Sequence, residues 1–443
     1  MLFTNNHHNA IHRKRNKSLG VPELIAIALG GMVGGGIFTI LGLSVSMIGV
    51  YTPVAIILGG VMASLAAYSY VKLAVYYKDE GATYSFYKKT FPKSPFAASL
   101  IGWWVVFGYI STLALYAYTF ASYAISGFTF ADSELVRKLV AGSIILVFTL
   151  INLWSVKGMG KIEDIMVYTK LIILAVISIV LINNSQTSLP VLIQNNGETS
   201  LMSILIVASI TFVAYEGFQL VIQAVNEMEN PEKNIPKAIY SAIFLAIMIY
   251  VIISLGAILA IPFEEITQNK EYALAAGAGH ILGHWGTNLV ILGALLATSS
   301  AISGTLFGAS RLMAVIASDG YLPPFMGNRI NHIPVYAIIS MAILAFLLVL
   351  AGGLELILEF GSVTFLLVSL LMAYTNYKIR DVTQSSSLLT LLAFTGLLSG
   401  TLLIFYYEFS HQPQQMFFIV AIYILLTVGS WIYSRNNKQV IEV

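Results

Sequence analysis

The sequence predicts an all-α membrane protein of about twelve transmembrane helices. Hydrophobic residues occupy 58% of its 443 positions and charged residues only 10%, and the mean hydropathy is +0.83. A soluble protein carries roughly 25% charged residues, so this chain cannot cover itself with a polar surface. Apolar stretches close to the roughly 20 residues that cross a bilayer recur along its whole length.

These apolar stretches define the predicted spans. Backbone groups in lipid must be hydrogen-bonded within their own segment, so we expect each span to be helical. The predicted spans are residues 22–48, 53–76, 97–127, 137–155, 164–183, 200–225, 237–261, 287–318, 334–351, 354–376, 387–407 and 415–434.

The distribution of positive charge predicts the orientation. We assign the basic tail, residues 1–18, to the cytoplasm, and twelve spans then put both termini on that side. Of the 23 Lys and Arg residues, 19 fall in segments assigned to the cytoplasm and three outside, at Arg137, Lys138 and Lys270. This bias obeys the positive-inside rule and predicts a multi-pass protein of an inner or plasma membrane, with its basic segments against anionic lipid.

The remaining basic residue, Lys170, lies well inside the fifth predicted span. An ionisable group at that depth costs several kcal/mol unless it meets a partner or a cavity, which makes it a candidate functional residue. The alternative is a lysine that reaches the interface along its own aliphatic chain.

Two spans contain irregular sequence near their middle. The first holds five glycines between Gly30 and Gly36. Close helix packing explains Gly30 and Gly34, but the consecutive Gly34, Gly35 and Gly36 favour unwound backbone, whose N–H groups can bind a carboxylate. The sixth span holds a glycine, aromatic residues and a carboxylate in residues 211–219. Interrupted helices at matching positions of two halves indicate the binding site of a transporter.

The sequence resembles the amino acid–polyamine–organocation superfamily of permeases over essentially its whole length. Five motifs carry the resemblance in the family's order. They are the glycine-rich first span, Glu80–Tyr84 in the first inner loop, Phe212–Phe218 in the sixth span, Glu229–Ala238 in a later inner loop, and Ser310–Leu312 followed by Asp319–Pro323.

The resemblance implies two five-helix halves related as an inverted repeat, with two helices appended. The halves would be residues 19–183 and 199–377, the appended spans residues 385–434, and the second cytoplasmic tail residues 435–443. The resemblance also implies a small-molecule substrate, an amino acid or related amine, held between spans one and six. We expect no nucleic-acid partner.

The implied substrate site is made from the two interrupted spans and span three. The carboxylate would bind amides of Gly34, Gly35, Gly36 and Ile37. The amine would meet carbonyls near Ala214 and Tyr215, beside Gly217. Aromatic gates would come from Phe212 or Phe218, and the opposite wall from Tyr109, Thr112 and Tyr116.

Lys170 resembles the lysine that, in one branch of the superfamily, occupies the place of a coupling sodium. The resemblance implies that its neighbours are Gly30, Val33, Ser299 and Ser300. An ammonium can replace a metal cation and can also release a proton. We therefore expect the proton to be the coupling ion, without any cofactor.

Two positions depart from the related exchangers of arginine and polyamines. Gln219 stands where those proteins carry a glutamate, and Glu216 stands where an apolar residue is expected. Three interpretations of Glu216 remain open. It contacts a cationic substrate group, it caps the broken helix, or it pairs with Lys170.

These features favour a proton-coupled amino acid symporter, with an exchanger of basic amino acids or polyamines as the alternative. A membrane enzyme is disfavoured, because we find no acidic pair within the spans and no nucleophile motif. A non-transporting nutrient sensor is a fourth possibility, opposed by the lack of a soluble domain. We expect no metal site at His280 and His284, and we expect Glu355 and Glu359 to face an aqueous vestibule.

Overall fold

The computed structural model describes residues 19–154, 156–195, 199–330 and 333–441. Across these ranges the regular structure is helical, apart from two isolated bridges. Nine of the described segments are long and apolar enough to cross a membrane, and two more apolar helices, Val21–Met32 and Val335–Ala351, are shorter. The chain is therefore an all-helical, multi-pass membrane protein, as its composition predicts.

The first five predicted spans coincide with helices, and the first of them is divided in two. The helices of this part are α1 (Val21–Met32), α2 (Gly36–Ile48), α3 (Thr52–Tyr77), α4 (Ala82–Thr90), α5 (Pro95–Ile125), α6 (Glu134–Trp154), α7 (Val156–Asn183) and α8 (Leu189–Asn195).

The remaining predicted spans also coincide with helices, and the sixth is interrupted. Its parts are α9 (Leu201–Thr211), the 3-10 turn η2 (Phe212–Tyr215) and α10 (Leu220–Gln223). The helices that follow are α11 (Pro231–Ala260), α12 (Phe263–Gln268), α13 (Ala273–Ser318), α14 (Val335–Ala351), α15 (Leu354–Lys378), α16 (Arg380–Thr383), α17 (Ser387–His411) and α18 (Pro413–Ile441).

Local backbone chemistry explains both interruptions. The helix α1 ends because Val33 adopts φ −82° and ψ 66°, outside the helical region, and α2 begins at Gly36. In the other interrupted segment Glu216 is extended and Gly217 has φ +126°. That conformation is strained for a residue with a Cβ atom, so a glycine is needed at position 217.

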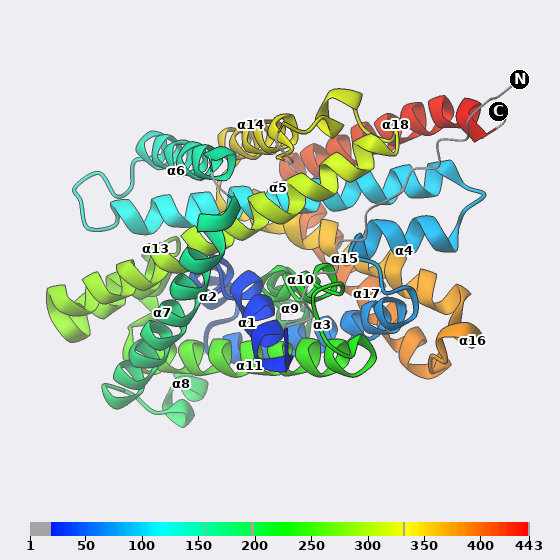
Figure 1. Ribbon diagram of the computed structural model, residues 1–443. Helices are drawn as coiled ribbons and strands as arrows, with labels where there is room; N and C mark the ends of the chain where they lie inside the picture. Colours follow the sequence, from blue (N-terminus) through cyan, green and yellow to red (C-terminus); the bar gives the residue numbers. More distant parts are fainter. Residues whose placement is uncertain (1–18, 155, 196–198, 331–332, 442–443) are drawn as a thin grey trace, which may run out of the picture.

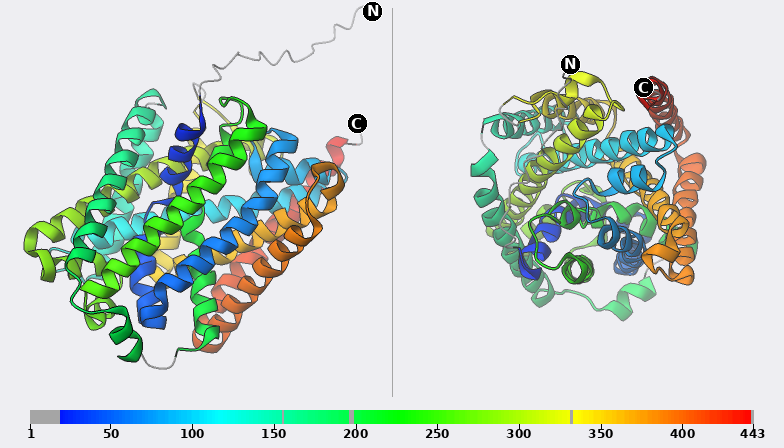
Figure 2. Two further views of the ribbon diagram at one scale, coloured as in Figure 1. Left: turned by 90° about the horizontal axis from the view of Figure 1, so that it is seen from below. Right: turned by 45° about the vertical axis from the view of Figure 1, so that its right-hand side comes forward.

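The interrupted helices lie at the centre of the bundle. Figure 1 shows α1, α2, α9 and α10 surrounded by the long helices. The helix α5 packs against α13, α15 and α18, and α11 packs against α3, α1 and α7. In the right-hand view of Figure 2, α17 and α18 lie at the edge of the molecule.

Large apolar side chains cover the outside of this bundle. They include Leu139, Leu146 and Leu150 on α6, Ile343 and Leu347 on α14, and Ile424 and Leu425 on α18, all exposed. An apolar surface of this extent on a soluble protein would be an aggregation liability. Lipid is the solvent that suits it.

Candidate functional site

The two interrupted helices meet backbone to backbone. A Cβ atom built on Gly217 would lie 2.6 Å from the carbonyl carbon of Gly31 and 2.7 Å from the nitrogen of Met32. A Cβ atom on Gly31 would in turn lie 3.1 Å from the Cα atom of Gly217. Side chains are excluded at this crossing, so the free backbone groups of both breaks come together in one place.

Two tyrosines hydrogen-bond the carbonyl groups that the breaks release. The hydroxyl of Tyr250, on α11, lies 2.7 Å from Met32 O and 3.0 Å from Ala214 O, and so bridges the two breaks. The hydroxyl of Tyr116, on α5, donates to Gly31 O at 3.3 Å. Sequence reasoning did not identify Tyr250, because a single tyrosine in an apolar helix carries no distinctive signal.

The glycines at the start of α2 are covered closely by their neighbours. A Cβ atom at Gly34 would lie 3.0 Å from the Tyr116 ring, and one at Gly35 would lie 2.9 Å from Thr119 Oγ1. A Cβ atom at Gly36 would lie 3.0 Å from the side chain of Ala214. The first N–H groups of any helix lack intrahelical acceptors. Just before α2, the Gly34 N–H donates to Met32 O at 2.9 Å, and residues 34–37 are not part of the lining of the cavity described below.

Lys170 is fully buried and joins three helices. Its Nζ atom, on α7, donates to Gly30 O of α1 at 2.9 Å and to Ser300 Oγ of α13 at 2.9 Å. Its exposed fraction is 0%, so it does not reach the interface. The structure thus brings together three of the residues predicted from the sequence.

Two other residues predicted around Lys170 are placed less directly. Val33 is buried and forms the end of α1, with its N–H on Leu29 O. Ser299 is half-buried on α13, and the hydroxyl bonded to Lys170 is that of the adjacent Ser300. A Cβ atom at Gly30 would lie 3.2 Å from Val167, one turn from Lys170 on α7, so α1 and α7 are in close contact here.

Glu216 lies at the break before α10 with an exposed fraction of 3%. The Nε2 group of Gln219 donates a hydrogen bond to Glu216 Oε2. The Oε1 atom of Gln219 accepts a hydrogen bond from the Gly217 N–H at 3.0 Å. The described residues offer no hydrogen bond to the other carboxylate oxygen, Glu216 Oε1. Gln219 therefore satisfies half of the carboxylate and leaves one oxygen for another donor.

A small cavity of about 20 Å³ lies beside this carboxylate. Such a volume holds about one water molecule and is too small for an amino acid. Helices α1, α5, α10, α13 and α15 contribute to its wall. The lining residues are Gly31, Tyr109, Thr112, Tyr116, Glu216, Gly217, Leu220, Gln223, Gly304, Thr305, Ala309 and Phe365.

The cavity contains some of the predicted site residues and omits others. Tyr109, Thr112 and Tyr116, which the sequence predicted as a wall of the substrate site, line this cavity, and Tyr109 packs edge-on against Phe365 at 5.8 Å. Sequence reasoning missed Phe365 and the residues of α13, because their contribution depends on how distant helices are packed.

The remaining aromatic residues of the sixth span point elsewhere. Phe212 is fully buried, and Phe218 packs against Tyr70 at 5.3 Å. The Tyr215 hydroxyl donates to Ile56 O of α3 at 2.7 Å. Ala214 contributes the carbonyl that Tyr250 binds. None of these four residues belongs to the lining of the cavity in the described structure.

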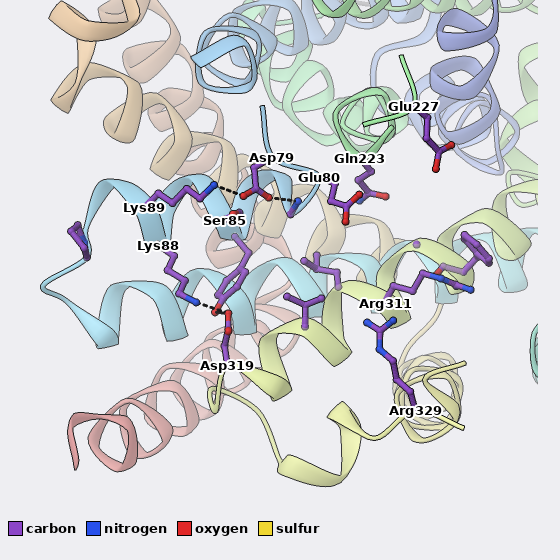
Figure 3. Close-up of a pocket in the computed structure, with 17 residues that line it drawn as sticks. Asp79, Glu80, Ser85, Lys88, Lys89, Gln223, Glu227, Arg311, Asp319 and Arg329 are labelled. Carbon is purple, nitrogen blue, oxygen red and sulfur yellow. Dashed lines mark hydrogen bonds and ion pairs between the residues drawn. The ribbon is translucent and has the colours of Figure 1, made fainter. Parts of the chain in front are cut away.

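A larger vestibule of about 850 Å³ adjoins the small cavity, and Gln223 lines both. Figure 3 shows Arg311 and Arg329 across from Gln223 and Glu227. Glu80 of its wall accepts a hydrogen bond from Asn226, close to the bridge between Leu19 and Met228. The vestibule therefore opens on the side of the molecule where α1 begins.

Ion pairs hold α4 at the rim of this vestibule. Lys88 Nζ and Tyr84 Oη both donate to Asp319 Oδ2, at 2.7 and 2.6 Å (Figure 3). Partial burial disfavours the ionised form of Asp79, but the hydrogen bonds from Lys89 and the Gly81 N–H outweigh it and lower the pKa of Asp79. The first inner loop is thus fixed to the end of α13.

Two sequence predictions about acidic residues were wrong. Glu359 does not face a vestibule, because its exposed fraction is 1%. An acidic pair within the spans does exist, since Glu359 of α15 faces the fully buried Glu408 of α17. The sequence separates these residues by 49 positions, so the packing of α15 against α17 was needed to see the pair.

Of the two histidines considered for a metal site, His280 and His284, the structure describes the side chain of His284. The side chain of His280 lies outside the described part of the structure, and His284 is exposed beside the kink at Gly283. Among the side chains that are described, no three His, Cys, Asp or Glu residues form a group that could hold a metal ion.

The interrupted central helices, the apolar exterior and the enclosed site define a multi-pass membrane transporter. Residues 19–431 match the amino acid permease family, and the chain belongs to that family. It is 28% identical to an "uncharacterized protein" of Methanocaldococcus jannaschii, over 96% of this chain and 97% of the relative. It is 27% identical to the inner membrane transport protein YbaT of Escherichia coli, over 95% and 97%. It is 24% identical to the branched-chain amino acid permease BcaP of Bacillus subtilis, over 69% and 68%.

Removing the Tyr250 hydroxyl should destabilise the crossing of the two breaks. Tyr250→Phe keeps the ring packed on Tyr215 and removes the one hydroxyl donor that Met32 O and Ala214 O share, which costs about 1–3 kcal/mol. Met32 O keeps its second donor, the Gly34 N–H at 2.9 Å. The unfolding free energy in detergent measures this effect. Tyr406→Phe, at an exposed position of α17, should change it by less than about 0.5 kcal/mol. Equal stability of the two variants would show that the bridge is energetically unimportant.

A side chain at Gly35 should close the start of α2 to a carboxylate. Gly35→Val places its Cβ atom 2.9 Å from Thr119 Oγ1, and we expect loss of amino acid binding in a folded, membrane-inserted protein. Decarboxylated analogues should bind poorly to the wild type. Gly127→Val is the control, because nothing lies within 4 Å of a Cβ atom there. Equal affinity of the wild type for an amino acid and its amine would refute the carboxylate assignment.

Proposed function

We propose that this permease is a secondary active transporter that carries amino acids by proton-coupled symport. Membership of the amino acid permease family supports the substrate class, as does the similarity to a branched-chain amino acid permease. The proposal includes twelve spans, with spans one to five and six to ten as inverted repeats and α17 and α18 appended. Both termini lie in the cytoplasm.

The observation that carries the proposal is the position of Lys170. Its ammonium sits between a carbonyl oxygen of the broken helix α1 and a hydroxyl of α13, at 2.9 Å from each. Oxygen atoms of this kind suit a small cation, and a protonated lysine supplies the same charge from within the chain. Deprotonation removes that charge and weakens both contacts, so proton binding can control how tightly α1, α7 and α13 are held together.

The substrate binds where the two breaks meet. Its carboxylate accepts hydrogen bonds from amides of the segment Gly34–Ile37, and its amine approaches the carbonyls of the sixth span near Ala214. The cavity of about 20 Å³ is contracted in this conformation. Movement of Gln223, which lines both the cavity and the vestibule, is the simplest way to admit an amino acid.

The conformation described faces the cytoplasm. Its vestibule of about 850 Å³ opens on the side where α1 begins, and the positive-inside bias assigns that side to the cytoplasm. On the opposite side α12 packs against α2. The vestibule is then the exit route, and transport requires the opposite side to open in turn.

A second function is supported by Glu216. Its Oε1 atom is buried without a hydrogen-bond partner in the described structure and borders the cavity. An ammonium or guanidinium group of a substrate would satisfy that oxygen. The alternative to a symporter of neutral amino acids is therefore an exchanger of basic amino acids or polyamines, with Glu216 as the cation-binding residue.

Loss of the lysine charge should uncouple transport from the proton gradient. In proteoliposomes, wild-type uptake should be independent of sodium and faster with an inward proton gradient. Lys170→Ala and Lys170→Met should still bind substrate, because the amides of α2 are a separate site, but their uptake should not respond to pH. Lys378→Ala, at the exposed end of α15, should behave as wild type. Sodium-stimulated uptake, or unchanged proton dependence in the alanine variant, would overturn the mechanism.

Neutralising Glu216 distinguishes the two substrate classes. If the carboxylate binds a cationic side chain, Glu216→Gln should weaken cationic substrates by about 1–3 kcal/mol, the usual range for a lost charged hydrogen bond. Binding of neutral amino acids should be nearly unchanged. A competition assay with both classes measures this difference. A uniform loss across them would assign Glu216 a structural role.

A further inference from the structure

Two buried carboxyl groups outside the substrate site face each other near the end of the bundle opposite the vestibule. Glu359 lies on the second turn of α15, and Glu408 lies on the last turn of α17. Their exposed fractions are 1% and 0%. The two groups are within hydrogen-bonding reach of each other.

The protein supplies almost no donor to this pair. In the described chain, both carboxylate oxygens of Glu408 and Oε2 of Glu359 are buried without a hydrogen-bond partner. An ionised carboxylate only accepts hydrogen bonds, so two ionised groups could not bond to each other. Burying even one unpaired carboxylate is costly, and two adjacent ones repel. One shared proton removes the repulsion and supplies the missing donor.

Other charged and titratable side chains from α15, α17 and the loop between α12 and α13 surround the pair. Glu355 lies one turn before Glu359 on α15, and Tyr407 and His411 lie beside Glu408 on α17. Lys270 reaches the cluster from the loop between α12 and α13. This one cation is already bound to Glu355, whose Oε2 atom also accepts a hydrogen bond from Gln412 at 3.0 Å.

The same loop lies directly against the broken first helix. A Cβ atom at Gly42 of α2 would lie 2.0 Å from Lys270 O, so the loop can approach α2 only because residue 42 is a glycine. A continuous chain of contacts therefore runs from Glu408 through Glu359, Glu355 and Lys270 to α2. A change of charge at one end acts on the packing at the other.

We propose that Glu359 and Glu408 together bind one proton, and that this proton stabilises closure of the side of the transporter opposite the vestibule. With the proton bound, the pair carries a single negative charge and Lys270 stays on Glu355, next to α2. Without it, two adjacent buried negative charges repel each other, compete for Lys270 and favour a conformation in which water reaches the pair. The proton exchanges with the aqueous phase on that side. This site is independent of Lys170 and of the proposed substrate.

Infrared spectroscopy tests the proton directly. A protonated carboxyl group has a carbonyl stretch that an ionised one lacks and that shifts in deuterated water. The wild type at neutral pH should show this band, and Glu359→Gln combined with Glu408→Gln should lose one component of it. That variant removes both charges at nearly unchanged side-chain shape and should fold. Each single substitution should also remove the component, because an amide can donate to the remaining carboxylate.

Two controls separate this signal from those of other carboxyl groups. Glu216→Gln removes any contribution from the substrate cavity and should leave the component in place. Asp381→Asn alters an exposed carboxylate and should change nothing in this band. An identical carboxyl band in the wild type and the double variant would overturn the proposal. Because the measurement needs no transport, it stands or falls separately from symport through Lys170.

Cysteine labelling tests the coupling to closure. The chain contains no cysteine, so Val45→Cys introduces a single reactive thiol. Val45 is buried on α2, one turn beyond Gly42. The thiolate is the reactive form of cysteine, so the labelling rate with a water-soluble maleimide is divided by the rate measured at the same pH in unfolded protein. This corrected labelling rate should rise with pH when the pair is intact. It should stay low and flat in the double glutamine variant. The same pH dependence in both backgrounds would refute the coupling.

Discussion

At the centre of the bundle the backbone of Gly217 lies so close to Gly31 and Met32 that no Cβ atom fits between them. Both helices are interrupted at this crossing, and their free carbonyls must find donors within the protein because lipid supplies none. Tyr250 donates to one carbonyl from each break. The crossing thereby sets the position of α2, whose first amides belong to the proposed carboxylate site, and of Gly30, whose carbonyl accepts a hydrogen bond from Lys170.

The buried ionisable groups inside the bundle have three different kinds of hydrogen-bonding surroundings. Lys170 is matched by a carbonyl and a hydroxyl, and Glu216 is half satisfied by the amide of Gln219. Glu359 and Glu408 face each other, and within the described structure both oxygens of Glu408 and Oε2 of Glu359 lack a hydrogen-bond partner. Each arrangement suits a different task, since a matched cation can hold helices together, an unfilled oxygen can receive a ligand, and a pair of acids can hold a proton. An amino acid permease that couples uptake to a proton gradient has a use for all three.

Much of the fold was predictable because the bilayer imposes a strict rule on composition. Each predicted apolar stretch coincides with helix, and the interruptions fall at the two irregular segments identified in the sequence, residues 30–36 and 211–219. The contact of Lys170 with Gly30 and Ser300 was expected from a family resemblance, and no periodicity in the chain would have indicated it. The aromatic residues show the limit of such reasoning. Phe212, Tyr215 and Phe218 pack into neighbouring helices, whereas Phe365 lines the cavity.

The sequence by itself determined that this chain is helical and membrane-embedded, where two of its helices break, and that Lys170 and Glu216 lie within its spans. Hydropathy, glycine content and the cost of buried charge are local properties, so they can be judged one segment at a time. Only the tertiary structure decided which of those residues meet. The bridge made by Tyr250 and the pairing of Glu359 with Glu408 depend on how helices distant in the chain are rotated against each other. That rotation is determined by the packing of many side chains together, which no single segment encodes.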